Sequence, residues 1–204
     1  MKTVRKLENE IGGRWHGISF FNDPENVPPN VQCRQVPRFC EAIKLAVVHK
    51  MVVKPGQFTC PGACYAFGGM VNLKETMIDK MVEQRGYSVD HAARLFEKTP
   101  HFQKMPEMIG FNCMDEPDIV ISQLQPAQVM RLLQMYNVKL GRDFRTEISS
   151  IISACGNTAV RAYEKQDLAI SFGCDDSRAF GGLSRDMLYV GLPYFLAEKF
   201  TREN

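Results

Sequence analysis

Seven cysteines give this chain most of its capacity for chemistry, and four of them stand at matching places in two stretches. Cys40 is followed by Cys60 after 20 positions, and Cys155 is followed by Cys174 after 19. Each stretch closes on Ala-Phe-Gly-Gly. A duplicated unit that repeats its thiols would bring them near one pseudo-twofold axis, where thiolates could bind a metal or a cluster. The alternative is a coincidence between two βα-like units that both end in glycine-rich turns.

Cys60 and Cys64 enclose the sequence Pro-Gly-Ala. Two thiols around such a turn can converge on one metal, and the backbone N–H groups that the turn exposes stabilise the negative charge of a cluster. The spacing is Cys-x3-Cys rather than the stronger Cys-x2-Cys, and the alternative is a strand-turn-helix whose cysteines pack in the core. Cys40 and Cys155 are expected at helix starts, where the helix dipole would lower the pKa of a thiol.

The resulting hypothesis is a metal or cofactor site whose ligands come from five cysteines. These candidates are Cys40, Cys60, Cys64, Cys155 and Cys174. Four thiolates suffice for a [4Fe–4S] cluster, and also for a zinc ion, which is the alternative. If only three bind, one iron stays open toward a substrate. Cys113, before an acidic turn, is interpreted as structural. Cys33 lies in a proline-rich loop from which it could reach a site, but it is not expected to be a ligand.

The segment from Gly173 to Arg178 directly follows a predicted strand. Ligands of open α/β sheets gather at the carboxyl ends of strands, so Asp175 and Arg178 are candidate ligand-binding residues beside Cys174. Arg178 is expected to face the pocket and to pair with an anionic ligand. The alternative is a capped turn in which Asp175 or Asp176 accepts backbone hydrogen bonds, with Arg178 in a surface ion pair.

The glycine pairs that close the two stretches, at 68–69 and 181–182, do not fit a nucleotide-binding fingerprint. Neither GxGxxG nor GxxxxGK[ST] occurs, so nucleotide binding is not supported. These glycines are instead expected to provide a positive φ or a close backbone approach near one shared pocket.

Composition and charge exclude several classes of protein. The 204 residues carry 25 basic and 23 acidic side chains, a balance that predicts neither a nucleic-acid nor a membrane-surface partner. No run approaches the roughly 18 apolar residues of a membrane helix, and the charged first residues do not resemble an export signal. A cytoplasmic protein is expected, with reduced thiols and an oligomeric state that the sequence leaves open between monomer and homo-oligomer.

Hydrophobic patterns predict alternating strands and helices, typical of an α/β or α+β fold. Strands are expected at 17–21, 117–122, 168–172 and 188–192, and helices at 1–13, 38–51, 73–84, 88–98, from Pro126 onward, 158–165 and 193–199. We expect one domain over 1–204. The matching positions of the cysteines in the two stretches allow an internal duplication of 15–100 and 117–204. The two βα-type halves would then pack about a pseudo-twofold axis, with a seam between them at 100–117.

The order of five short segments resembles the uncharacterised cysteine-containing family of archaea and bacteria known as ArCR. The segments are Phe39-Cys40-Glu41-Ala42, Cys60-Pro61-Gly62-Ala63, Pro117-Asp118-Ile119-Val120, Ile170-Ser171-Phe172-Gly173-Cys174 with Ser177-Arg178, and Val190-Gly191-Leu192-Pro193. The resemblance covers most of residues 15–200. It implies a prokaryotic, often anaerobic, cytoplasmic origin, where oxygen-sensitive iron–sulfur sites survive, and it supplies no catalytic residues.

Besides a structural subunit whose cysteines only pack in the core, two hypotheses of function follow. The first is a cytoplasmic metal-binding protein with a cysteine-ligated iron–sulfur site, or zinc as the alternative, in redox or small-molecule chemistry. The second is a metal-free protein that binds a small molecule or reacts through a thiol in a pocket between the halves. Neither the substrate, the redox partner nor a catalytic residue can be assigned from the sequence.

Overall fold

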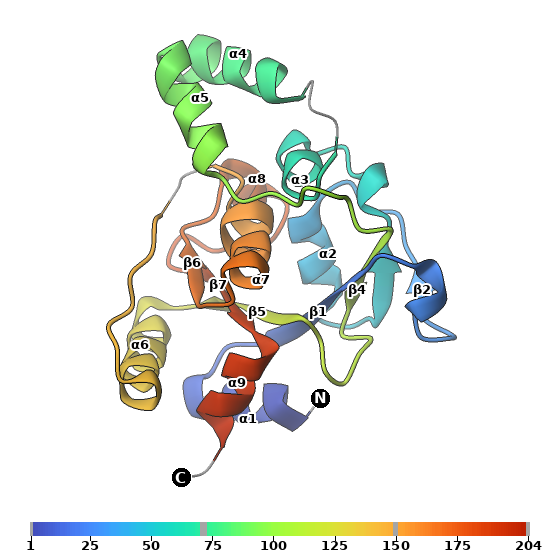
Figure 1. The fold of residues 1–204 in the computed structure, drawn as a ribbon, viewed down its shortest axis with the longest axis vertical. Coiled ribbons are helices and arrows are strands. Elements are labelled where there is room, and N and C mark those ends of the chain that lie inside the picture. The colour runs from blue at the N-terminus through green and yellow to red at the C-terminus, as the bar shows by residue number, and fades with distance from the viewer. Residues whose placement is uncertain (1, 70–72, 149–150, 203–204) are drawn as a thin grey trace.

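A computed structural model describes residues 2–69, 73–148 and 151–202. Its centre is a mixed sheet of seven strands in the order β2-β3-β4-β1-β5-β7-β6, with helices on both faces (Figure 1). Neighbouring strands are antiparallel except β2 and β3. The strands are β1 (Trp15–Phe21), β2 (Gln32–Cys33), β3 (Met51–Val53), β4 (Met108–Phe111), β5 (Ile119–Leu124), β6 (Ala169–Ser171) and β7 (Leu188–Pro193). The expected α/β class is confirmed.

The alternation of side chains along the central strands divides the core into two layers. On β5, Val120 and Leu124 pack with α1 (Lys2–Ile11), α6 (Pro126–Leu140) and α9 (Tyr194–Thr201). On the same strand, Ile119 and Ile121 pack into the opposite layer. That layer includes α2 (Phe39–Leu45), α3 (Pro61–Ala66), α4 (Leu73–Arg85), α5 (Val89–Lys98), the π-helix η3 (Ser153–Val160) and α7 (Arg161–Lys165).

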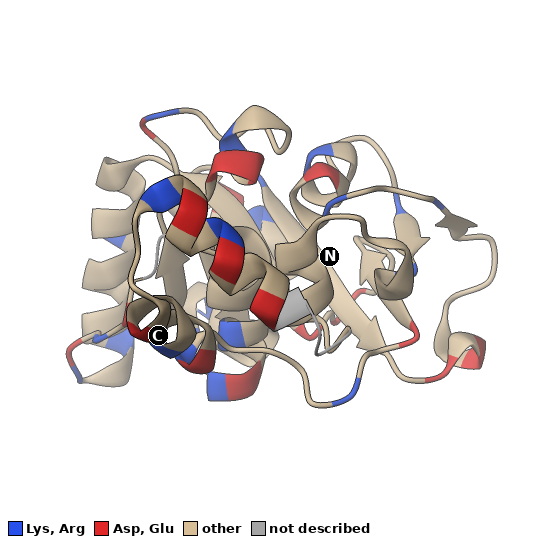
Figure 2. Ribbon diagram, turned by 90° about the horizontal axis from the view of Figure 1, so that it is seen from above, with Lys and Arg blue, Asp and Glu red and all other residues tan. Residues whose placement is uncertain are grey.

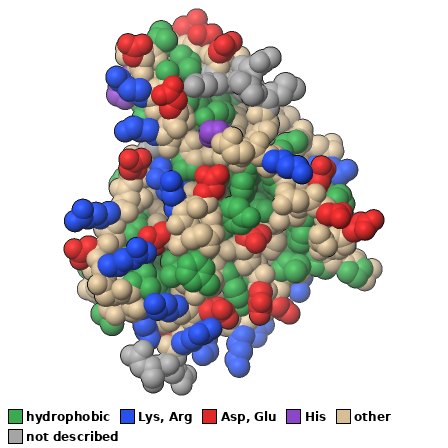
Figure 3. Space-filling model, in the orientation of Figure 1, with side chains coloured by type: hydrophobic (Ala, Val, Ile, Leu, Met, Phe, Trp, Pro, Cys, Tyr) green, Lys and Arg blue, Asp and Glu red, His purple; other side chains and the backbone are tan. Residues whose placement is uncertain are grey.

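Three short helices complete the structure: the 3-10 helices η1 (Pro24–Asn26) and η2 (Pro55–Gln57), and α8 (Asp175–Ala179). The α4–α5 hairpin extends from one end of the molecule (Figure 1). Ser88 caps α5 by accepting a hydrogen bond from the backbone N–H of His91 at 3.3 Å, so the helix start predicted there is confirmed. Acidic and basic residues are interspersed both at the end seen in Figure 2 and on the face seen in Figure 3.

The strand order reads alike from the β1–β5 boundary toward either edge. On one side come β1, β4 and β3, and on the other come β5, β7 and β6. Along the chain, each triplet runs from the inner strand to the outer strand and then to the middle strand. The connections differ: η1, β2 and α2, then η2, α3, α4 and α5 in the first triplet, but α6, η3 and α7, then α8 alone in the second. The strand order alone is shared, and two related halves stay a prediction. A pseudo-twofold axis between them stays a prediction, which a superposition of residues 38–69 on 153–183 tests.

Two strands lie where the sequence analysis placed other structure. The helix expected at 38–51 ends at Leu45, and Met51–Val53 forms β3. The segment 100–117, expected as a seam, contains β4, whose Phe111 pairs with Ile18 of β1. In the sheet, β4 lies between β3 and β1, and a division of the chain at this segment stays a prediction.

Candidate functional site

Four cysteine thiols converge from four separate elements on one side of the sheet. Cys40 lies in the first turn of α2 and Cys155 lies in η3, while Cys60 and Cys174 are the N-cap residues of α3 and α8. The charge of Cys174 acts on the thiols of Cys40, Cys60 and Cys155, and the charge of Cys60 acts on those of Cys40 and Cys155. These four residues are called the thiol cluster below.

Burial dominates the ionisation of the thiol cluster. It raises the pKa of Cys40 to about 12, with smaller contributions from the charges of Cys174 and Cys60. Burial likewise raises the pKa of Cys60 to about 12 and that of Cys155 well above its usual value. The lowered pKa values that the sequence predicted for Cys40 and Cys155 were therefore wrong. The cost of desolvating a thiolate exceeds the effect of a helix start.

Backbone N–H groups nevertheless point at three of these sulfurs. The donors belong to Glu41 beside Cys40, Ala63 beside Cys60 and Gly156 beside Cys155, and each opposes the rise in pKa of its thiol. Such donors partly neutralise the negative charge of sulfur ligands in iron–sulfur proteins. Burial therefore keeps the Cys40, Cys60 and Cys155 thiols protonated near neutral pH, while these N–H donors act in the opposite direction and favour their thiolates.

Asp176 connects the two cysteine-bearing stretches. Its carboxylate accepts a hydrogen bond from the Cys60 thiol at 3.4 Å, and its backbone carbonyl lies 3.8 Å from Sγ of Cys40. Arg38 donates to the same carboxylate at 3.4 Å, and its guanidinium lies 3.8 Å from the centre of the Phe180 ring. Asp176 belongs to the segment that the sequence singled out after the strand, but only Asp175 and Arg178 of that segment were predicted as ligand-binding residues beside Cys174. Its position two residues after Cys174 was the signal that could have identified it.

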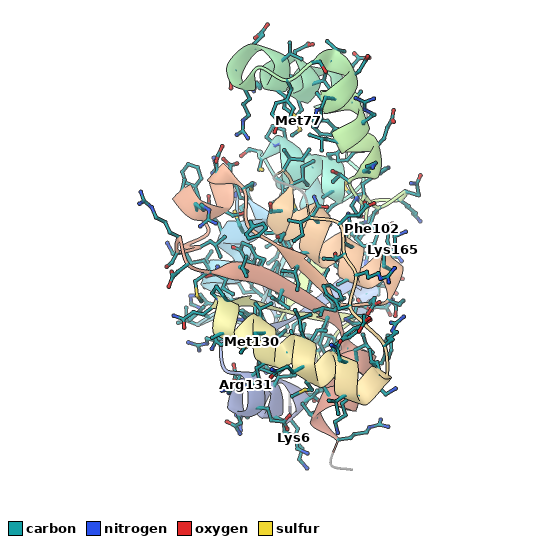
Figure 4. The ribbon with its side chains drawn as sticks, turned by 90° about the vertical axis from the view of Figure 1, so that its left-hand side faces the viewer. Lys6, Met77, Phe102, Met130, Arg131 and Lys165 are labelled. Atoms are coloured by element: carbon teal, nitrogen blue, oxygen red, sulfur yellow. The ribbon has the colours of Figure 1, made fainter. Side chains whose placement is uncertain are left out.

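A cavity of about 250 Å³ opens beside the thiol cluster. Three cysteines of the thiol cluster line one wall of this cavity: Cys60, Cys155 and Cys174. Helix α4 forms the opposite wall through Met77, Lys80, Met81, Gln84 and Arg85. Met77 faces the body of the protein from α4 (Figure 4). An ion pair between Arg85 and Asp175 joins α4 to α8 across this cavity.

Comparison with known proteins agrees with the resemblance noted in the sequence. Residues 16–202 match the family described as uncharacterised ArCR. The chain belongs to the ArCR family. It is also similar to the uncharacterized protein MJ0308 of Methanocaldococcus jannaschii, with 24% identity over 165 residues, which are 76% of this chain and 71% of the relative. No solved structure matches the chain.

In this ArCR chain, the other sequence-predicted residues lie apart from the thiol cluster or at its edge. The thiol of Cys64 donates to the carbonyl of Phe58 at 2.9 Å, and Cys64 is not among the residues that line the cavity. Asp175 does line the cavity. Arg178 donates to the carbonyls of Phe172 at 2.6 Å and Ser184 at 2.8 Å, so its guanidinium holds its own loop together and does not line the cavity.

The glycine pairs of the ArCR chain show the expected positive φ and close packing, but Gly68 and Gly69 line a hollow of their own rather than the cavity beside the thiol cluster. Gly68 and Gly182 have φ values of 81° and 71°, while Gly69 and Gly181 pack too closely against their neighbours for a side chain. A Cβ at Gly181 would lie 2.7 Å from Cβ of Cys40, so this glycine allows α8 to approach α2. Gly68 and Gly69 line a separate hollow with Tyr65 and His101.

Among the described residues, no group of three or more His, Cys, Asp or Glu side chains is arranged to hold a metal ion. All seven cysteines are free thiols. Within the described ranges, no helix is both long enough and apolar enough to cross a membrane.

The thiols should differ strongly in reactivity when the protein is metal-free. With iodoacetamide near pH 8, we expect Cys33 to be alkylated first because it is exposed, and Cys40 and Cys155 last because they are buried and have raised pKa values. The rate at Cys40 should keep rising with pH up to about 12, as the thiolate fraction grows. Peptide mass spectrometry over a time course measures the order. Modification of Cys155 as fast as Cys33 would contradict the buried cluster.

Proposed function

We propose that this ArCR protein is a cytoplasmic, prokaryotic protein that binds an iron–sulfur cluster through Cys40, Cys60, Cys155 and Cys174. The cluster would serve redox or small-molecule chemistry at the adjoining cavity. The observation that carries the proposal is the convergence of four thiols from four elements whose charges act on one another. The presence of seven free thiols suits a reducing compartment.

The arrangement of the ligands favours a cluster over a zinc ion. Structural zinc sites are closed and usually draw ligands in pairs from short Cys-x2–4-Cys spacings. The one such spacing here is Cys60 to Cys64, and the Cys64 thiol is directed to a backbone carbonyl instead. The four converging thiols come from four separate elements, three of them receive backbone N–H donors, and three of them line an open cavity, as suits a cluster that meets a substrate or partner.

A second candidate function is the binding of a small molecule without metal. Its support is the apolar part of the cavity wall, formed by Met77, Met81, Ile151 and Ile152. A thiol nucleophile is a weaker form of this candidate. The raised pKa values of Cys60 and Cys155 keep both thiols protonated near neutral pH, and the thiol form is a poor nucleophile.

Metal analysis of protein purified without oxygen, and then incubated with ferrous iron and sulfide, tests the proposal. We expect iron and acid-labile sulfide to remain after desalting, near one cluster per chain, with a broad visible absorbance that bleaches on reduction. Protein that stays colourless and retains neither iron nor sulfide would overturn the proposal and leave the metal-free candidate. Retention of zinc alone would instead assign the zinc alternative.

A further inference from the structure

A second hollow, of about 420 Å³, lies where α1, β1 and the segment after α2 meet. None of the four cysteines of the thiol cluster lines it. We call it the His16 pocket, because His16 is a histidine buried to 4% exposure that lines its wall. Its volume falls in the range of small-molecule sites in proteins, roughly 300–1,000 Å³. The mechanism proposed for the cysteines does not use this pocket.

Asn112 determines which nitrogen of His16 carries the proton. The side-chain carbonyl of Asn112 accepts the backbone N–H of Gly17 at 2.8 Å, so its orientation is fixed. The Asn112 amide nitrogen then donates to the carbonyl of Ala46 at 2.9 Å and to Nδ1 of His16 at 3.1 Å. A ring nitrogen that accepts a hydrogen bond has no proton of its own. The neutral His16 ring therefore carries its proton on Nε2.

Asn112 is held for this role by an uncommon backbone conformation. Its φ of 53° lies in the left-handed region, which asparagine tolerates better than most residues. The backbone N–H of Asn112 donates to the carbonyl of Gly17 at 2.8 Å, so two hydrogen bonds clamp this residue to the strand that carries His16. Backbone conformations of this kind collect at binding and catalytic sites.

The Nε2–H group of His16 is a donor without a protein acceptor in the described part of the chain. The one hydrogen bond that the structure gives this side chain is at Nδ1. Burial first, and the charge of Arg14 second, lower the pKa of His16 to about 4, so the ring is neutral near pH 7. Among the described residues, the buried side-chain atoms without a partner are Ser153 Oγ and Arg161 Nε, so Nε2 of His16 is reached by water from the pocket. An acceptor that enters the pocket would replace that water as the partner of Nε2–H.

The charged side chains around the pocket favour an acceptor with a negative charge. Arg5, Arg14 and Lys50 line it against the carboxylates of Glu8 and Asp115. Glu8 accepts the backbone N–H of Trp15 at 3.1 Å, which draws part of its charge away from the pocket. Arg14 donates to the carbonyl of Val47 at 2.6 Å through one of its nitrogens. The cationic groups therefore outnumber the anionic ones around a neutral N–H donor.

We propose that the His16 pocket binds the oxyanion group of a small molecule, a phosphate ester or a carboxylate. Nε2–H of His16 would donate to one oxygen, and Arg14 and Lys50 would balance the charge. A neutral histidine is suited to this task because it donates a hydrogen bond without the cost of burying a second charge. This site is independent of the cysteines, so it stands or fails separately from the proposed cluster.

Ring-nitrogen NMR of ¹⁵N-histidine-labelled protein, titrated with inorganic phosphate and separately with acetate, tests the pocket. The unliganded spectrum should show His16 protonated at Nε2 and not at Nδ1. Either anion should then shift the Nε2 resonance with saturation, and the anion that binds more tightly identifies the source as phosphate ester or carboxylate. A ring protonated at Nδ1, or an Nε2 resonance that neither anion moves at millimolar concentration, would overturn the proposal.

Variants separate this site from general anion binding. His16→Phe should weaken binding roughly tenfold or more, by loss of a hydrogen bond to a charged group. Because that change is in the core, Lys50→Gln provides a second test at an exposed position, with an expected weakening of roughly two- to fivefold. The control is His91→Gln on the exposed face of α5, which should leave affinity unchanged. Unchanged affinity in both pocket variants would place the anion elsewhere.

Discussion

Replacing Cys60 or Cys174 with serine is expected to remove bound iron while the chain stays folded. Serine keeps the size of the side chain but is a poor ligand for soft metals. Loss of even an indirect partner of a metal site costs about 10–100-fold in affinity, so loss of a ligand should cost at least that. Both residues are N-caps, of α3 and α8, and serine is favoured at this position. Iron and sulfide per chain after anaerobic reconstitution measure the effect.

Two cysteines serve as controls for this series. Cys64→Ser should retain iron, because the Cys64 thiol donates to the Phe58 carbonyl rather than joining the other four. Cys113→Ser should also retain it, because Cys113 packs with the small cluster of Phe21, Val52 and Met108. Circular dichroism and thermal melting verify that every variant is folded. Equal loss of iron at Cys60, Cys174 and Cys113 would show that the assignment of ligands is incorrect.

The spacing of the cysteines predicted more of the candidate site than any local motif did. The echo between the two stretches grouped Cys40, Cys60, Cys155 and Cys174, which are the thiols whose charges interact in the structure. The local motif also suggested Cys64, one helical turn after Cys60. Sequence spacing does not say where a side chain points, and here the amide of Cys64 joins α3 while its thiol turns back to Phe58.

The contribution of α4 to the cavity could not be derived from the sequence. Lys80 and Arg85 are ordinary charged residues on a helix, and only the tertiary path of the hairpin brings them opposite the cysteines. The depth at which the Cys40 thiol is buried could not be derived from the sequence either. A position in the first turn of a helix suggested a lowered pKa for Cys40, whereas its burial beneath α8 raises the pKa. The missing α4 wall and the wrong pKa direction for Cys40 both depend on contacts between distant parts of the chain, which local sequence patterns do not predict.

Strand prediction succeeded where apolar runs were long and failed where they were short. The strands predicted at 117–122 and 188–192 correspond to β5 and β7, which pair over six residues each. By contrast, β3 has three residues and follows a helix closely, so the helix predicted at 38–51 included Met51, and no strand was predicted at Val52 and Val53. In β4, Gly110 interrupts the run of apolar residues, and a side chain at this position would collide with Cys113 and Phe21. Partner strands, rather than intrinsic preference, determine both elements.

Phe67→Ala is expected to produce a large loss of stability. Phe67 has 0% exposure and lies at the centre of an aromatic cluster, with ring centroids 4.9 Å from Phe39, 5.8 Å from Phe58 and 6.1 Å from Phe102. Truncating a fully buried phenylalanine costs about 3–5 kcal/mol in the free energy of unfolding, through lost burial and the cavity left behind. In a chain of this size each kcal/mol lowers Tm by about 2–4 °C. Urea denaturation measures the change.

The matched control is Phe195→Ala, which removes the same atoms from a side chain that is 50% exposed on α9 and should cost far less. Phe67 is the C-cap of α3, and Cys60 is the N-cap of the same helix, so the aromatic cluster anchors the element that carries a proposed ligand. We therefore expect Phe67→Ala, unlike Phe195→Ala, to weaken iron retention as well as stability. The variant could instead lose stability but keep iron as firmly as the unaltered protein. That result would mean that Asp176 and the bound iron–sulfur cluster fix the position of Cys60, rather than the aromatic core beneath α3.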